Sequence, residues 1–381
     1  MGRRVEIITS ASEAELAESF ARPDIGHVFV IAPNYEERSL GATELLDRCL
    51  PKSSEQRVGV FQITLQSTRP RDVLDRIKSS NRRYSEQQLR SRTNFMAEPA
   101  TIPMGQASFV PMMAKIRRLC RDSGDQVRLY IDISALPRTI LLGMLDDLLG
   151  AWSPTIGGVA VGRTSRITSI FFIYTPARRY PPKHSDDTLG VIRGRYSHAP
   201  LHELLSEQVS RVELCLFLAG NSHDAAQTLG ALPQRGGPAD GVGLHAFMYF
   251  SPDNALLSYS KFGDNLWSIR ELRARSVQLT YTFGITHTAD LLGRYAQNAA
   301  HDHLQRDDEN AWFLIGGFGP KPVGLCSYLA KKRYDSIVGK SGILNQSDVL
   351  VVDGSQYTSL YSIDSGPARV YHIDVETVLS I

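Results

Sequence analysis

Long apolar runs are missing from this sequence, and their absence excludes a membrane-spanning helix. No apolar stretch approaches the roughly 18–20 residues that cross a bilayer. The amino-terminal sequence MGRRVEIITSASEAELAESF has no apolar core of the signal-peptide type. A myristoylation signal requires Ser or Thr at the position that Glu6 occupies. We therefore expect a cytoplasmic protein without a membrane partner.

The sequence also has few cysteines and a small net charge. The four cysteines, Cys49, Cys120, Cys215 and Cys326, lie far apart and form no C-x-x-C pair. This spacing indicates free, buried thiols in a reducing compartment rather than a disulfide framework. The net charge is +2 for 381 residues, so no overall field attracts nucleic acid or a membrane. Any such attraction must come from a local patch.

Several motifs that carry chemistry are missing as well. No G-x-S-x-G elbow of a serine hydrolase is present. The GKS at 339–341 is not a phosphate-binding P-loop, because that motif needs glycine where Tyr334 stands. The HDH at 301–303 lies in a charged stretch that is typical of a solvated surface. We therefore expect no metal and no cofactor.

Short β-branched and aromatic runs alternate instead with segments of helical periodicity. Most of these strand candidates are apolar on both faces, which indicates mostly parallel sheets with helices on both faces. The sequence predicts an α/β fold with two Rossmann-like domains in tandem. The predicted strands are residues 27–33, 57–65, 126–133, 166–175, 212–220, 244–251, 277–284, 311–317, 348–354 and 369–375.

Composition also predicts the domain boundaries. The stretch ARRYPPKHSDDTLGVIRGRYSHAP has paired prolines, mixed charges and little periodicity, as in a linker. We predict an N-terminal domain at 1–180, a linker at 181–204 and a C-terminal domain at 205–381. The two halves show similar patterns, and both a duplication and two ordinary domains in series explain this.

Ligands of open parallel sheets bind outside the carboxyl ends of the strands, so the loops there are the candidate sites. In the first half, Asn34 and Glu36 follow one strand. Asn34 is a candidate ligand residue or the cap of a helix that starts near residue 35. Asp132, Ser134 and Arg138 follow another strand, and a charge in that position needs partners. Arg138 could pair with a carboxylate or hold a phosphate.

The second half has a glycine-rich loop in FLIGGFGPKPVGLCSYL, residues 313–329. Gly316, Gly317 and Gly319 allow close approach of the backbone to a ligand, and Lys321 brings a positive charge to a helix start. Thr286 and His287 follow a different strand and could add hydrogen bonds. These residues predict a site for a nucleotide or phosphate.

One segment of the first half is locally basic. The sequence predicts a helical insertion at about 66–106, with two helices and a polar turn within 68–92. Arg76, Arg82 and Arg83 are its candidate nucleic-acid contacts, although acidic residues dilute the charge. A solvated helical surface is the alternative.

The loop LIGGFGPKPVGLCSYLA resembles the glycine-rich strand–loop–helix turn of CRISPR-associated Rossmann-fold (CARF) sensor domains and their SAVED-type relatives. Gly316 and Gly317 match the glycine pair of that turn and Lys321 its lysine, at a slightly longer spacing; Phe318 and Pro320 depart from it. The resemblance implies a sensor of a cyclic or linear oligonucleotide second messenger, a role in bacterial antiviral defence and a homodimer that shares one ligand site.

Three hypotheses follow for the function. The first is a nucleotide- or phosphate-binding sensor or regulatory module. The second is a phosphodiester or nucleotide hydrolase or transferase, in which Asp132 and Glu36 are acid–base groups and Arg138 stabilises negative charge. The third is a protein-interaction scaffold, in which the loops are only turns. A partner protein of the same system would fit the first or the third.

Overall fold

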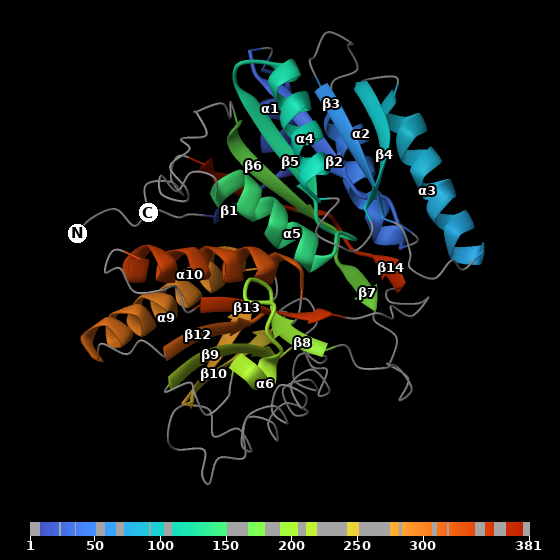
Figure 1. Ribbon diagram of the computed structural model, residues 1–381. Coiled ribbons are helices and arrows are strands. Elements are labelled where there is room, and N and C mark those ends of the chain that lie inside the picture. Colours follow the sequence, from blue (N-terminus) through green and yellow to red (C-terminus); the bar gives the residue numbers. More distant parts are fainter. Residues whose placement is uncertain are drawn as a thin grey trace. The chain divides into compact units, whose positions relative to one another are not determined.

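The structure of the protein is a computed structural model in which two compact units are present. One unit is Met1–Ser185 with Tyr357–Ser380, and the other is Asp186–Gln356 with Ile381. Each is an α/β domain built on a mixed, mostly parallel sheet (Figure 1). The predicted tandem of Rossmann-like α/β domains is confirmed. The structure describes residues 8–22, 24–34, 36–50, 58–65, 72–90, 93–102, 109–150, 167–179, 191–204, 211–218, 242–250, 275–281, 284–306, 311–317, 320–339, 347–353 and 363–375.

The first unit contains most of the described helices. Its strands are β1 (Ile8–Ala11), β2 (Gly26–Ile31), β3 (Val58–Leu65), β4 (Asn94–Ile102), β5 (Val127–Asp132), β6 (Ile167–Tyr174), β7 (Ala177–Arg179), β14 (Ile363–Ser365) and β15 (Arg369–Asp374). Its described helices are α1 (Glu13–Phe20), the 3-10 turn η1 (Glu37–Leu40), α2 (Gly41–Cys49), α3 (Asp72–Arg90), α4 (Phe109–Ser123), α5 (Arg138–Leu145) and the π-helical turn η3 (Asp146–Gly150).

The order of the strands in the seven-stranded sheet is β1-β15-β6-β5-β2-β3-β4. The strands from β6 to β4 are parallel, whereas β15 is antiparallel to β6 and to β1. From β2 the chain adds β3 and β4 in one direction, and then β5 and β6 in the other. This is the Rossmann order, and its topological switch point lies between β2 and β5.

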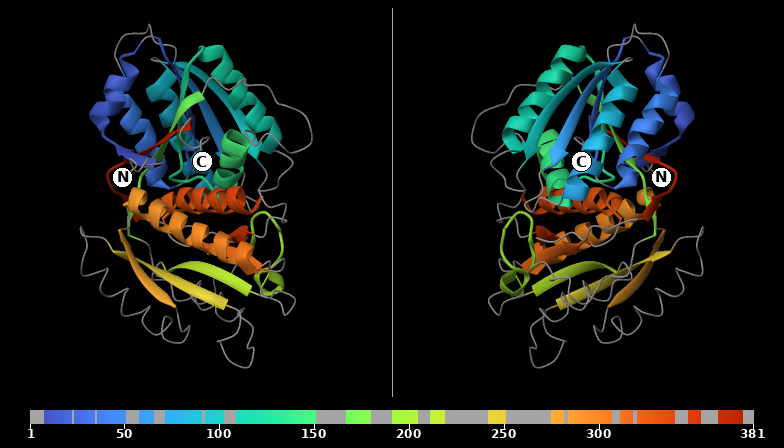
Figure 2. Two further views of the ribbon diagram at one scale, coloured as in Figure 1. Left: turned by 90° about the vertical axis from the view of Figure 1, so that its left-hand side faces the viewer. Right: turned by 90° about the vertical axis from the view of Figure 1, so that its right-hand side faces the viewer.

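Local sequence explains how these elements form. Strand β2, with the sequence GHVFVI, is buried along its whole length, as expected for a strand covered on both faces. Helix α1 begins with a capping box in which the Ser12 hydroxyl accepts from the Glu15 N–H and the Glu15 carboxylate accepts from the Ser12 N–H. Figure 2 shows the blue helices α1 and α2 on one side of the sheet, and α4 and α5 on the other.

The second unit has the same arrangement of strands. Its six-stranded sheet has the order β11-β10-β9-β12-β13-β8, with only β8 antiparallel to its neighbour. Strands β9, β10 and β11 advance in one direction and β12 and β13 in the other, so the switch point lies between β9 and β12. The strands are β8 (Val191–Gly194), β9 (Arg211–Leu218), β10 (Val242–Phe250), β11 (Ser276–Tyr281), β12 (Ala311–Gly316) and β13 (Ser347–Asp353), and the described helices are α6 (Leu201–Leu204), α9 (Ile285–Arg306) and α10 (Pro322–Val338).

The two units of the structure have different boundaries from the domains predicted from the sequence. Residues 369–374 form β15, which pairs with β6 and β1 in the first sheet, although the C-terminal domain was expected to extend to residue 381. Strand β8 pairs with β13 in the second sheet, although it falls within the expected linker. Both strands join their sheets by antiparallel pairing, β8 as an edge strand and β15 between β1 and β6, and such long-range pairing leaves no mark in the local pattern.

The basic segment is also organised differently from the prediction. A single helix, α3, covers Asp72–Arg90, so the prediction of two helices with a polar turn is wrong. Strand β4 follows α3 and pairs in parallel with β3. The segment is therefore a β3–α3–β4 crossover that completes the sheet rather than a helical insertion. The polar residues Ser79, Ser80 and Asn81, which are typical of turns, lie inside this helix.

Two further expectations concern membranes and cysteines. Within the described part of the chain, no helix is both long enough and apolar enough to cross a membrane. Cys49, Cys120, Cys215 and Cys326 are buried free thiols, as predicted. Burial raises the pKa of the Cys120 thiol to about 12, so this side chain is protonated and packs as an apolar group.

Candidate functional site

The carboxyl ends of β2 and β5 form the candidate site of the first unit. These strands are neighbours at the switch point, so the loops that follow them lie at the same edge of the sheet (Figure 1). The first loop contains Asn34 and Glu36, and the second contains Asp132 and Ser134. The sequence had selected both loops without information on strand order.

The loop after β2 is held by its own polar groups. The side chains of Glu36 and Arg38 form an ion pair that is almost completely buried. The Ser39 hydroxyl donates to the Glu36 carbonyl at 2.6 Å, and the Asn34 N–H donates to the Ser39 oxygen at 2.9 Å. The side-chain amide of Asn81 in α3 donates to the Asn34 carbonyl at 2.6 Å. Asn34 does not cap a helix, because the first described turn starts at Glu37 with Glu36 as its cap residue.

The loop after β5 is equally ordered by hydrogen bonds. The Asp132 carboxylate accepts the N–H of Ser134 at 2.9 Å, and the Ser134 hydroxyl accepts the N–H of Thr175 at 2.9 Å. Asp132, Ser134 and Thr175 are each at most 1% exposed. Arg138, half-buried, is the first residue of α5. The bond between Ser134 and Thr175 ties the end of β5 to the end of β6.

Thr175, the residue after β6, connects the start of α2 with the loop after β5. A methyl group on Gly41, the first residue of α2, would lie only 2.1 Å from the Thr175 hydroxyl, so α2 begins directly against the residue after β6. Strand β5 lies between β2 and β6. Thr175 also donates to Ser134, so it links the start of α2 to the Asp132 loop. Glycine is required at position 41 because any side chain would collide with Thr175.

In the second unit, the glycine-rich loop follows β12 at the switch point. Gly316 ends β12, and Lys321 immediately precedes α10, whose first residue is Pro322. A methyl group on Gly317 would approach the hydroxyl of Ser327 in α10 to 2.9 Å. Gly317 thus permits close packing of β12 against α10, which is one of the roles of glycine in Rossmann-type turns. Gly319 lies outside the described residues.

Thr286 and His287 lie further along the same edge. They are in the first turn of α9, which follows β11, and His287 is exposed. Strand β11 is three strand spacings from β12, about 14 Å along the sheet. The first turn of α9 still contacts α10, since the Cys326 thiol donates to the Ile285 carbonyl at 3.5 Å. The prediction that Thr286 and His287 share a site with Gly316 stays a prediction.

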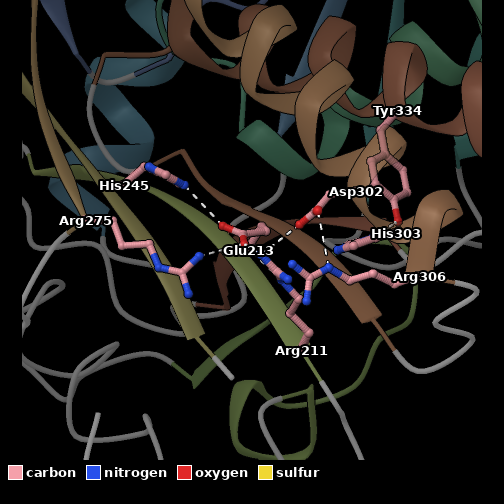
Figure 3. A network of polar contacts seen from close by, with 8 residues as sticks. All are labelled: Arg211, Glu213, His245, Arg275, Asp302, His303, Arg306 and Tyr334. Atoms are coloured by element: carbon pink, nitrogen blue, oxygen red, sulfur yellow. Dashed lines mark hydrogen bonds and ion pairs between the residues drawn. The ribbon is translucent and has the colours of Figure 1, made fainter. Parts of the chain in front are cut away.

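A polar network that sequence reasoning missed lies at the opposite, amino-terminal edge of the second sheet. Figure 3 shows Arg211, His245 and Arg275 pointing toward the carboxylate of Glu213. Arg211 and Arg275 donate to the same carboxylate oxygen at 2.9 and 3.0 Å, and His245 Nε2 lies 3.1 Å from the other oxygen. A methyl group on Gly243 would collide with the Glu213 carboxylate at 2.0 Å, so glycine there makes room for it.

The network continues in two directions from Glu213. If His245 donates from Nε2 to the carboxylate, its Nδ1 accepts from the Ser276 hydroxyl at 2.8 Å, and the Tyr295 hydroxyl lies 2.9 Å from Ser276. In the other direction, Arg211 pairs with Asp302 of α9 at 2.8 Å. The network therefore ties β9, β10, β11 and α9 together, and we interpret it as structural.

Electrostatics explains how the buried Glu213 carboxylate stays charged. Burial by itself would raise the pKa of Glu213. Hydrogen bonds from His245 and Arg211, together with the positive charges of Arg275 and Arg211, outweigh burial and lower the pKa below its ordinary value. A charge inside an apolar strand was a visible signal in the sequence RVELCLFL, because such a group needs partners. Most of the partners of Glu213 come from distant segments of the chain and could not be predicted from the sequence.

Comparison with known proteins adds no assignment. No protein-family model matches the chain, and no curated protein matches its sequence. Among the described residues, no group of three or more His, Cys, Asp or Glu side chains is arranged to hold a metal ion. The geometry of the two switch points is therefore the basis for a functional proposal.

Proposed function

We propose that the protein binds a phosphorylated ligand of the nucleotide type at the carboxyl ends of its parallel strands and acts as a sensor or regulatory module. One observation carries this proposal. Both sheets have the Rossmann order, and in each unit a loop selected from the sequence follows a strand that flanks the switch point. Open α/β sheets bind their ligands at such points.

The second unit supports an anionic ligand. Close packing of Gly317 against Ser327 aligns α10 with the end of β12, and α10 is a 17-residue helix whose amino end bears partial positive charge. Lys321 adds a full charge beside that end. The resemblance of Gly316, Gly317 and Lys321 to the CARF and SAVED turn extends the proposal to a cyclic or linear oligonucleotide second messenger, used in bacterial defence by a homodimer.

The first unit supports binding more than acid–base catalysis. The Glu36 carboxylate is paired with Arg38, and the Asp132 carboxylate accepts a main-chain N–H. Both contacts are almost completely buried, so they fix the shape of the loops. Loops of fixed shape at the edge of the sheet are suited to recognising a ligand. A catalytic carboxylate, in contrast, must exchange a proton with the substrate.

Thermal unfolding with a panel of nucleotides and cyclic oligonucleotides tests the proposal. A ligand at about 100 times its Kd stabilises the bound domain by about 2.7 kcal/mol, which raises the Tm of a domain of this size by about 5–10 °C. The Lys321→Ala variant should lose most of this shift. Lys332→Ala, on the same helix but away from its amino end, is the matched control and should keep it.

Two results of this experiment would contradict the proposal. The absence of any Tm shift across the panel would contradict nucleotide binding. An equal shift in wild type and Lys321→Ala would show that the ligand binds elsewhere than at the loop before α10.

A further inference from the structure

Helix α3 has one exposed face that extends along its whole length. The exposed residues recur at spacings of three or four, which places them on one side of an α-helix. The other side is packed: Leu89 is buried, and the Thr43 hydroxyl of α2 donates to buried Ser85 at 3.0 Å. Figure 1 shows α3 at the margin of the first unit, beside β4. The exposed face consists of Val73, Arg76, Ile77, Ser79, Ser80, Arg83, Tyr84, Gln87 and Arg90.

Positive charge is regularly spaced on this face. Arg76, Arg83 and Arg90 recur every seven residues, so their side chains emerge in nearly the same direction, about 10.5 Å apart along the axis. Asp75 and Glu86 lie to the side and are only half-exposed, and Glu86 pairs with Arg90 at 3.4 Å. Among the described side chains of α3, the exposed face holds no carboxylate. Its charge complements a polyanion.

Apolar and aromatic side chains lie between the arginines. Val73 is 69% exposed, Ile77 41% and Tyr84 37%. A tyrosine ring and arginine guanidinium groups both stack on nucleobases, and exposed bases are available in single strands but not in a duplex. A chain of phosphates with unstacked bases therefore matches both features of this face.

We propose that the exposed face of α3 binds single-stranded nucleic acid, with Arg76, Arg83 and Arg90 contacting phosphates and Tyr84 stacking on a base. This function is additional to ligand binding at the switch points, because it uses the outer side of a crossover helix and not a loop at the sheet edge.

Fluorescence anisotropy with labelled oligo-dT and oligo-U of roughly 20 nucleotides tests the proposal. Three phosphate contacts predict a slope of about −2 for log K against log salt, which is about a 20-fold loss of affinity from about 50 to 200 mM salt. Each single Arg→Gln change at these positions should make the slope shallower by about 0.7. The triple change should abolish most of the binding.

A matched variant loses the same charge elsewhere in the first unit. Arg22, Arg118 and Arg121 are 53%, 73% and 69% exposed and lie outside α3, so the triple change of these residues to Gln should preserve binding. Tyr84→Ala should weaken binding about fivefold or more without changing the slope, whereas Tyr84→Phe should retain it.

Several results would overturn the proposal. They are no binding of either oligonucleotide at about 50 mM salt, equal losses in the two triple variants, or an unchanged affinity in Tyr84→Ala. Tighter binding to a duplex of the same length, or to phosphatidylserine vesicles, would also assign the face to another partner.

Discussion

Replacing Glu213 with glutamine tests the network of Figure 3 with the smallest change in shape. The Glu213 side chain is 9% exposed, and its carboxylate accepts hydrogen bonds from Arg211, Arg275 and His245. Glutamine retains one acceptor oxygen but loses the negative charge. Its NH2 group replaces the other oxygen, so the contact with His245 must rearrange.

The expected loss follows from the burial of the partners. Removing one member of a buried ion pair costs about 3–5 kcal/mol, because the remaining charges stay buried without compensation. Arg211 is 18% exposed and Arg275 46%, so Arg275 recovers part of its hydration. We therefore expect Glu213→Gln to lower the free energy of unfolding by about 3 kcal/mol at pH 7, near the lower end of this range. With a urea m value of about 3 kcal/mol/M, the unfolding midpoint falls by about 1 M.

The pH dependence provides a second, independent check. The pKa of Glu213 in the folded protein lies below its ordinary value of 4.5, because the His245 and Arg211 hydrogen bonds and nearby charges outweigh burial. A carboxylate with a lowered folded pKa contributes stability above its unfolded pKa and loses that contribution as the pH falls through the folded pKa. The stability difference between wild type and Glu213→Gln should therefore be complete at about pH 7 and shrink below about pH 4.5.

Urea unfolding followed by circular dichroism measures both effects. Glu203→Gln is the matched control, because Glu203 is exposed in the same unit and its change should alter stability by less than about 0.5 kcal/mol. Equal stabilities of wild type and Glu213→Gln at about pH 7 would refute the reasoning. So would a difference that persists unchanged to about pH 3.

Two further predictions concern the switch points. Gly317→Ala places a methyl group 2.9 Å from the Ser327 hydroxyl, so we expect the free energy of unfolding, measured with urea, to fall by about 1–3 kcal/mol. A second change, Ser327→Ala, should restore part of this stability. An unchanged midpoint in the single variant would contradict close packing at this position. Ser134→Ala leaves the buried N–H of Thr175 without its acceptor, so we expect the free energy of unfolding to fall by about 1–3 kcal/mol. A decrease below about 0.5 kcal/mol would show that this bond does not hold the ends of β5 and β6 together.

The sequence predicted the strands well because burial on both faces leaves a local signal. The ten predicted strand segments all contain strands of the structure, among them β2 and β9, whose apolar runs are almost continuous. The strands missed were β1, β4, β7, β8 and β14. Apart from β4, these are short, with three or four residues, and lie at sheet edges or in the two-stranded β7–β14 ribbon. At such positions a strand is covered less completely, and its apolar pattern is correspondingly weak.

For the candidate site, the sequence selected the loops but not their neighbours. Asp132 and Ser134 stood out because polar groups directly after a buried strand need partners. Their actual partners, such as the N–H of Thr175, come from another strand. Glu213 carried the same signal inside β9, yet Asp302 lies 89 positions later in the sequence, and no local pattern connects the two.

Local periodicity and single residues are enough to predict the α/β class, the alternation of strands and helices, and the loops in which ligand chemistry is concentrated. The strand order, and hence the fact that the Glu36 and Asp132 loops follow neighbouring strands at a switch point, is visible only in the folded protein. Only the tertiary structure decided that β15 completes the first sheet. Strand pairing depends on hydrogen bonds between residues distant in the chain, and these are fixed only when the whole sheet packs.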